Sequence, residues 1–116
     1  MPLSDFWQVL EELVLRSEIV IDRPKNTAHP RYPDMIYPVD YGYLTDTRSM
    51  DDEGIDLYRG SDPAGRLDAI LCVADLHNRD SEIKLLIGCT AAEKQIIERF
   101  QNQTDCMKAL LIPRAT

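Results

Sequence analysis

The sequence predicts a mainly β protein of the α+β class, folded as a small closed or partly open β-barrel with an N-terminal and a C-terminal helix. Several short apolar or β-branched runs alternate with turn residues, and two stretches show helical periodicity. The length of 116 residues suits one compact domain. We therefore expect one domain over 1–116, with a helix at 4–15 and a barrel core at 18–112 that includes a helix at 91–101.

The first third of the chain changes its hydrophobic period twice. Apolar residues at helical spacing predict the first helix, with Ser4 as its N-cap. A β-branched run then predicts a strand at 18–22, which Pro24 stops. Four prolines between 24 and 38 exclude a helix or a central strand there and predict an extended, rigid loop. Aromatic residues then indicate a second strand at 37–44.

The remaining strands are predicted from short apolar runs. One lies at 55–59, after a polar, acidic turn. The apolar segments 67–74 and 83–87 are joined by charged residues, and this arrangement predicts a β-hairpin with a long polar tip over 75–82. A last strand is expected at 109–112. Turn-forming residues separate these segments, as in a small barrel.

The second helix has a clear start signal. Thr90 and Glu93 form a capping box, in which each side chain satisfies a backbone N–H that the first helical turn leaves free. The helix that follows presents apolar residues at helical spacing. We expect it to bury Ile96, Ile97 and Phe100 against the sheet.

Composition and charge exclude several classes of protein. Twenty acidic and thirteen basic residues give a net charge of −7, which opposes nucleic-acid binding because such proteins normally present a basic face. No apolar run reaches the roughly 20 residues of a membrane span, and the N-terminus lacks a signal-peptide layout. Cys72 and Cys89 lie in apolar runs and are predicted to be buried. We expect a cytoplasmic protein that contacts neither membranes nor nucleic acid.

The acidic turn Asp51 to Asp56 carries the sharpest chemical pattern. Asp51, Glu53 and Asp56 surround Gly54, and a turn can bend such carboxylates toward one point. Magnesium prefers oxygen ligands and keeps several waters, so two or three carboxylates suffice to hold it. The spacing differs from that of a helix-loop-helix calcium loop. A solvated acidic turn without a bound ion would have the same composition.

A second acidic group lies at the tip of the predicted hairpin. It contains Asp75, Asp80 and Glu82, with Lys84 close behind. An ordinary charged tip has the same composition. If the two acidic turns converge in one barrel, they can hold a pair of metal ions beside a phosphoryl group.

A third pattern is aromatic and basic. Tyr37, Tyr41 and Tyr43 occupy alternate positions and are expected on one face of a strand, either as packing residues or as part of a site. Guanidinium, ammonium and phenol groups are the donors that a phosphate needs. The basic residues near these tyrosines are Arg23, Lys25, His29 and Arg31.

Four segments between residues 18 and 88 follow a family pattern in the same order. The segment 36–44, IYPVDYGYL, resembles aromatic-Tyr-Pro-x-x-Tyr-Gly-Tyr-aliphatic, and 51–56, DDEGID, resembles the signature D-x-D-P-x-D. The segment 19–25, IVIDRPK, resembles an opening strand that ends in Pro-Lys. Asp75 and Asp80 reproduce the spacing of a second aspartate pair. Together these segments resemble the family I, magnesium-dependent inorganic pyrophosphatases.

The resemblance implies an OB-like barrel of the pyrophosphatase type that hydrolyses inorganic pyrophosphate to two phosphates with Mg²⁺, for which Mn²⁺ can substitute. The implied metal ligands are Asp51, Glu53, Asp56, Asp75 and Asp80. The implied substrate-binding residues are Lys25, Arg31, Tyr41 and Lys84. Glu53 and Tyr41 are the implied catalytic residues, with Glu53 at the position of the family's proposed general base.

The chain also departs from the family pattern. Glu53 replaces an aspartate and moves its carboxylate by one methylene, and Gly54 replaces a proline. Lys84 follows Asp80 by four residues instead of two, so Glu82 is an alternative to Asp80 as the ligand. Asn102 and Gln103 stand about where a phosphate-binding Tyr-Lys pair is expected. The metal-binding half of the pattern is therefore better preserved than the phosphate-binding half.

Three other functions remain open. A non-catalytic relative that binds a metal or phosphate ligand would keep the carboxylates without turnover, and a hydrolase of another small phosphoanhydride would use the same chemistry. A single-stranded nucleic-acid module has the aromatics but is opposed by the negative charge. We expect a homo-oligomer, for which the N-terminal helix is a candidate contact.

Overall fold

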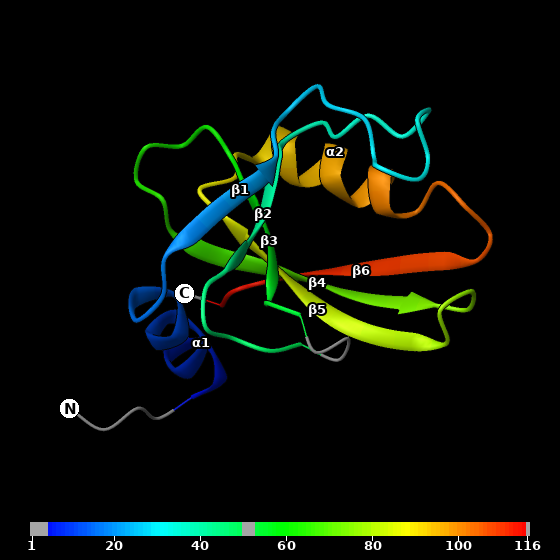
Figure 1. The fold of residues 1–116 in the computed structure, drawn as a ribbon. Coiled ribbons are helices and arrows are strands. Elements are labelled where there is room, and N and C mark those ends of the chain that lie inside the picture. Colours follow the sequence, from blue (N-terminus) through cyan, green and yellow to red (C-terminus); the bar gives the residue numbers. More distant parts are fainter. Residues whose placement is uncertain (1–4, 50–52, 116) are drawn as a thin grey trace.

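The computed structural model describes residues 5–49 and 53–115, and six strands of this part form one mixed sheet (Figure 1). The two helices lie on opposite sides of the sheet. They are α1 (Phe6–Leu15) and α2 (Ala91–Gln101). The strands are β1 (Ile19–Arg23), β2 (Asp40–Leu44), β3 (Asp56–Arg59), β4 (Leu67–Asp75), β5 (Asp80–Ile87) and β6 (Met107–Pro113).

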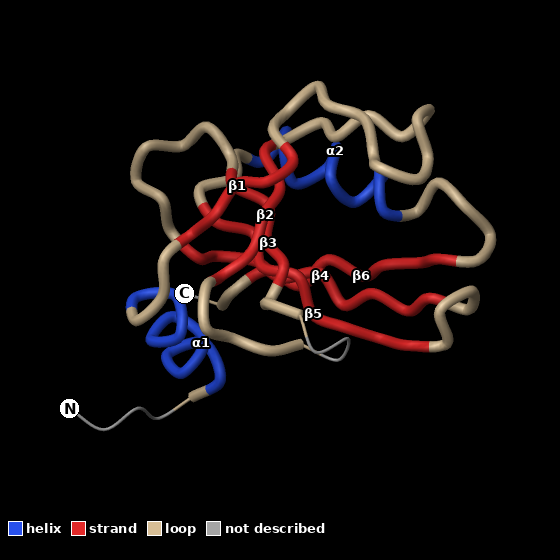
Figure 2. The backbone as a smooth tube through the Cα atoms, viewed as in Figure 1, coloured by secondary structure: helices blue, strands red, loops and turns tan. Residues whose placement is uncertain are grey.

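The sheet confirms the predicted fold class in its partly open form. The strand order is β1-β2-β3-β5-β4-β6, and within the described residues β1 and β6 form the two ends without closing the barrel. Neighbouring strands run antiparallel except β3 and β5, which are parallel. Figure 2 shows how the strands cross and curl between the two helices.

Alternation along the strands divides the core into two clusters, one on each face of the sheet. The cluster beneath α2 includes Tyr41, Tyr58, Leu71, Leu86, Ile97 and Phe100. The cluster on the α1 side includes Leu10, Leu44, Leu57, Ile70 and Leu85. Adjacent residues such as Leu85 and Leu86 therefore belong to opposite faces, as the period of two in a strand requires. The site described below lies on the α2 face.

Close contact between β1 and β2 depends on a glycine. Gly42 is paired with Ile21, and a Cβ atom built on Gly42 would lie 1.8 Å from the carbonyl oxygen of Val20. A side chain there would push the two strands apart. Gly42 therefore fixes β2, and with it Tyr41, close against β1.

Both helices fall within one or two residues of the predicted ranges. Ser4 lies outside the described residues, and Asp5 is the N-cap of α1, because its carboxylate accepts the backbone N–H of Gln8 at 2.8 Å. The capping box of Thr90 is confirmed. The predicted burial of Ile96 is wrong, since this side chain is 38% exposed while its neighbour Ile97 is fully buried.

The long polar hairpin tip predicted at 75–82 is wrong. The ladder between β4 and β5 continues to the pair Asp75 and Asp80, so the tip contains only residues 76–79. The charged residues that suggested a loop lie in the strands, because backbone pairing tolerates polar side chains at the end of a sheet. Neither described helix has the length and apolar character needed to cross a bilayer.

Candidate active site

A cleft of about 930 Å³ opens on the α2 face of the sheet. Acidic residues from β3, β4, β5 and the turn before β3 line one part of it, which we call the acidic side. These residues are Glu53, Asp56, Asp75, Asp80 and Glu82. Basic residues from the end of β1 and the following loop line another part, which we call the basic side. These residues are Arg23, His29 and Arg31.

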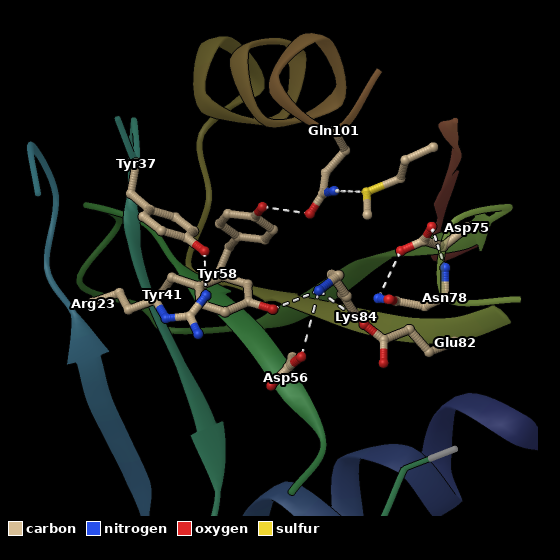
Figure 3. Close-up of polar contacts among 11 residues, drawn as sticks. Arg23, Tyr37, Tyr41, Asp56, Tyr58, Asp75, Asn78, Glu82, Lys84 and Gln101 are labelled. Carbon is tan, nitrogen blue, oxygen red and sulfur yellow. Dashed lines mark hydrogen bonds and ion pairs between the residues drawn. The ribbon is translucent and has the colours of Figure 1, made fainter. Parts of the chain in front are cut away.

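Lys84 lies at the centre of the acidic side (Figure 3). Its Nζ atom is 2.9 Å from Glu82 Oε1 and 3.4 Å from Asp56 Oδ2, and it also donates a hydrogen bond to the hydroxyl of Tyr41. The register explains this meeting. Leu57 is paired with Leu85 in the parallel ladder, so Asp56 lies beside Lys84 on the same face.

Burial and charge determine the protonation of this centre. Burial of Lys84 favours the neutral amine, but the negative charges of Asp56 and Glu82 outweigh it and raise the pKa of the ammonium. Burial, followed by the charge of Asp56, raises the pKa of Tyr41 well above its usual value. Lys84 is therefore charged and Tyr41 neutral at physiological pH.

Asp75 has a structural role at the end of β4. Its Oδ1 atom accepts the backbone N–H groups of His77 and Asn78 at 2.9 and 3.1 Å, and its Oδ2 accepts the side-chain amide of Asn78 at 3.1 Å. Both oxygens thus stabilise the four-residue tip. The carboxylate is buried, 8% exposed as a residue, and these bonds fix its direction.

The basic side is organised around Tyr37. Burial lowers the pKa of the Arg23 guanidinium, but the hydrogen bond that Arg23 donates to the Tyr37 hydroxyl, together with the electrostatic effects of its neighbours, outweighs burial and raises the pKa. The ring of His29 stacks on Tyr37 with centroids 6.1 Å apart. Burial and then the charges of Arg23 and Arg31 lower the pKa of His29. Within the described residues, neither arginine forms an ion pair with a carboxylate.

The described carboxylates do not by themselves form a metal site. Residues 53–115 and 5–49 contain no group of three or more His, Cys, Asp or Glu side chains placed to hold a metal ion. Mg²⁺ needs only one or two carboxylates when substrate phosphates and waters complete its shell, and Glu53 and Asp56 both reach the cleft. Asp51 lies outside the described residues. Asp75 is held by the turn, so a second cation at the hairpin tip fits less well.

The structure brings most of the predicted site residues into one cleft. Glu53, Asp56, Asp75, Asp80, Arg31, Tyr41 and Lys84 all line it. Lys25 does not line it, and its backbone N–H donates to Asp40 Oδ1 at 2.8 Å. The roles of these residues as metal ligands, substrate contacts or catalysts stay predictions.

Two polar residues at the cleft were not predicted: Gln101, which lines it, and Tyr58, which lies beneath and is hydrogen-bonded to Gln101. The hydroxyl of Tyr58, a fully buried residue, donates to Gln101 Oε1 at 2.6 Å and ties β3 to α2. Gln101 donates in turn to the sulfur of Met107 at 3.3 Å. Tyr58 follows Asp56 by two residues in a predicted strand, so strand alternation could have placed both side chains on the same face of the sheet. The end of α2 gives no comparable signal.

The fold and the cleft define a partly open barrel of the inorganic pyrophosphatase type. Two solved structures are similar to it. An inorganic phosphatase from Anaplasma phagocytophilum has a TM-score of 0.56 and 13% identity, over 82% of this chain and 81% of that chain. An inorganic pyrophosphatase from Helicobacter pylori has a TM-score of 0.53 and 16% identity, over 84% and 82%.

At these identities the likeness shows the fold alone. No protein-family model and no curated protein matches the sequence. Evidence for a function therefore lies in the residues of the cleft.

Proposed function

We propose that this protein hydrolyses inorganic pyrophosphate, or another small phosphoanhydride, with a divalent cation, Mg²⁺ or Mn²⁺, as its cofactor. One observation carries the proposal. A single cleft presents on its basic side two arginines that form no ion pair with any described carboxylate, and on its acidic side a group of carboxylates. The fold shared with the Helicobacter pylori inorganic pyrophosphatase supports the same substrate class.

The two sides together suit a complex of phosphate and metal better than either component alone. A bare polyanion would meet the guanidinium groups of Arg23 and Arg31 but would be repelled by the carboxylates across the cleft. A bare cation would be attracted by the carboxylates but repelled by the guanidinium groups. A diphosphate that carries a divalent cation presents the correct charge to each side, because the metal neutralises the oxygens that face the acids.

Glu53 and Asp56 would hold the cation, with Asp51, Asp75 and Asp80 as further proposed ligands. When bound, the metal supplies a Lewis acid and an acidified water for attack on phosphorus. Glu53 is the proposed general base that takes the proton of the attacking water. Arg31 and Tyr41 would orient the phosphates, and Lys25 is a further proposed contact. The sequence also suggested Lys84 as a phosphate contact, but its ammonium is engaged by Asp56 and Glu82.

A second function, binding of a phosphate ligand without turnover, is favoured by one specific observation. The carboxylate of Asp56 is already engaged by the Lys84 ammonium at 3.4 Å. A carboxylate that is already paired with an ammonium has less need of a metal ion. Such a protein would bind pyrophosphate and leave it intact.

The test is phosphate release from pyrophosphate with millimolar Mg²⁺ or Mn²⁺, compared between wild type and Asp56→Asn. We expect cation-dependent release that the variant reduces by about a hundredfold, because placement of this carboxylate is critical. Asp68→Asn is the matched control, since Asp68 pairs with Lys94 outside the cleft. Pyrophosphate binding without release would establish the non-catalytic function. Equal turnover by Asp56→Asn and wild type would show that this cleft is not the active site.

A further inference from the structure

The ammonium of Lys84 occupies the position of a small cation. Three oxygens from three strands converge on its Nζ atom: the hydroxyl of Tyr41 on β2, the carboxylate of Asp56 on β3 at 3.4 Å, and the carboxylate of Glu82 on β5 at 2.9 Å. Figure 3 shows the amine between them. The Lys84 side chain is only 10% exposed, so the arrangement is held inside the protein.

The three oxygens suit an ammonium and a divalent metal ion equally well. An ammonium has three N–H donors and no acceptor, and the three oxygens account for all three donors. Two carboxylates and a phenol oxygen are also hard ligands of the kind that Mg²⁺ and Mn²⁺ accept. The lysine therefore directs its charge toward the protein's own acids, and it leaves no donor for a phosphate in the cleft.

We propose that Lys84 is a built-in cation of the acidic side, which takes one cation position there and so limits the number of divalent ions that the cleft accepts. The inference rests on the proposed function only in that a divalent ion reaches this cleft. It makes Lys84 a residue that sets the metal requirement, in place of a phosphate contact. Asp56 and Glu82 are then held in fixed positions before any ligand arrives.

Removing the charge tests the proposal. Lys84→Met keeps a similar length but leaves two carboxylates facing each other without a counter-ion. In metal-free buffer we expect a thermal midpoint several degrees below that of wild type. Mn²⁺ titration followed by electron paramagnetic resonance should show one additional site, or binding at least about tenfold tighter than in wild type. Saturating Mn²⁺ should restore the midpoint of the variant.

Three control variants separate this effect from simple loss of an ion pair. Lys84→Arg keeps the positive charge and should gain no Mn²⁺ binding. Lys94→Met removes an ion pair of the same 2.9 Å length, to Asp68, and should lose stability that Mn²⁺ does not restore. Adding Asp56→Asn to Lys84→Met should abolish the gain, because one of the two carboxylates is then neutral.

The wild-type protein provides a second measurement if Lys84→Met does not fold without metal. The ammonium protons of Lys84 are observed by ¹⁵N-resolved NMR as Mg²⁺ is added. Their persistence at saturating Mg²⁺ supports the proposal, and their loss shows that the metal displaces the amine and overturns it. Unchanged Mn²⁺ affinity and stoichiometry in Lys84→Met also overturn it.

All these measurements are made without substrate, so they are independent of turnover. A protein that hydrolyses pyrophosphate but gains no Mn²⁺ site in Lys84→Met would refute this inference and leave the proposed function intact. A gain of Mn²⁺ binding in a protein that releases no phosphate would refute the hydrolase and leave this inference intact.

Discussion

The two sides of the cleft are built in different ways. The acidic side stands mostly on strands in the middle of the sheet, where Asp56 and Glu82 share a buried ammonium. The basic side stands on the end strand β1 and the loop that follows it, where Arg31 is exposed. On the acidic side a buried ammonium compensates two of the carboxylates, Asp56 and Glu82. On the basic side, the described arginines form no ion pair and leave their charge to solvent or to a ligand.

This difference implies that the acidic side contributes mainly to stability and the basic side mainly to ligand binding. Charges that are buried and paired cannot be removed singly without leaving an uncompensated partner. Charges on an exposed loop contribute little to folding but remain available to an incoming anion. We therefore expect substitutions on the acidic side to change the free energy of unfolding, and substitutions on the basic side to change affinity.

The largest expected effect on stability is that of Glu82→Gln. The substitution leaves the buried Lys84 charge with Asp56 as its remaining carboxylate partner, so we expect a loss of about 2 kcal/mol in the free energy of unfolding, measured by urea denaturation. Glu12→Gln is the matched control, because Glu12 pairs with Arg16 at the same 2.9 Å on an exposed helix surface. That change should cost less than about 0.5 kcal/mol. Equal losses in the two variants would contradict the comparison.

A smaller effect, on affinity alone, is expected for Arg31→Gln. Losing one charge-assisted contact should weaken pyrophosphate binding by about tenfold in isothermal titration. The free energy of unfolding should change by less than about 0.5 kcal/mol, since the side chain is exposed. Arg66→Gln, at an exposed position outside the cleft, should change neither quantity. Unchanged pyrophosphate affinity in Arg31→Gln would show that the basic side does not bind the anion.

The smallest expected effect is a shift in the titration of His29. Burial and the neighbouring arginines lower its pKa below 6.5 in the free protein, so NMR should show a neutral ring at pH 7. A bound polyanion favours the imidazolium and should raise this pKa. Because the folded-state pKa is depressed, the His29 contribution to stability is present above pH 6.5 and is lost as pH falls through the lower folded value. If pyrophosphate does not change the pKa of His29, the anion does not bind beside this residue.

Local signals in the sequence predicted the fold well. Thr90 and Glu93 marked the start of α2 because a capping box acts over four residues. The end of the β4–β5 hairpin was misplaced because Asp75, Asp80 and Glu82 are poor strand formers whose conformation is set by cross-strand pairing. Ile96 has the period of a buried residue but lies at the edge of the face that α2 presents to the sheet.

The candidate site was predictable in composition but not in its contacts. The carboxylates and tyrosines could be selected by residue type and spacing. The meeting of Lys84 with Asp56, 28 residues away, depends on the parallel register of β3 and β5. The bond between Tyr58 and Gln101 depends on where the end of α2 lies over the sheet. No local pattern reports either of these tertiary contacts.

The parallel pairing of β3 with β5 also determines when this cleft can exist during folding. The strands β1, β2 and β3 form one antiparallel unit, and β4, β5 and β6 form another. Asp56 belongs to the first unit and Lys84 to the second, so neither unit alone contains the charged centre. Because non-local strand pairing is slow and entropically costly, we expect the docking of these two halves to be the late folding step that brings Asp56 to Lys84.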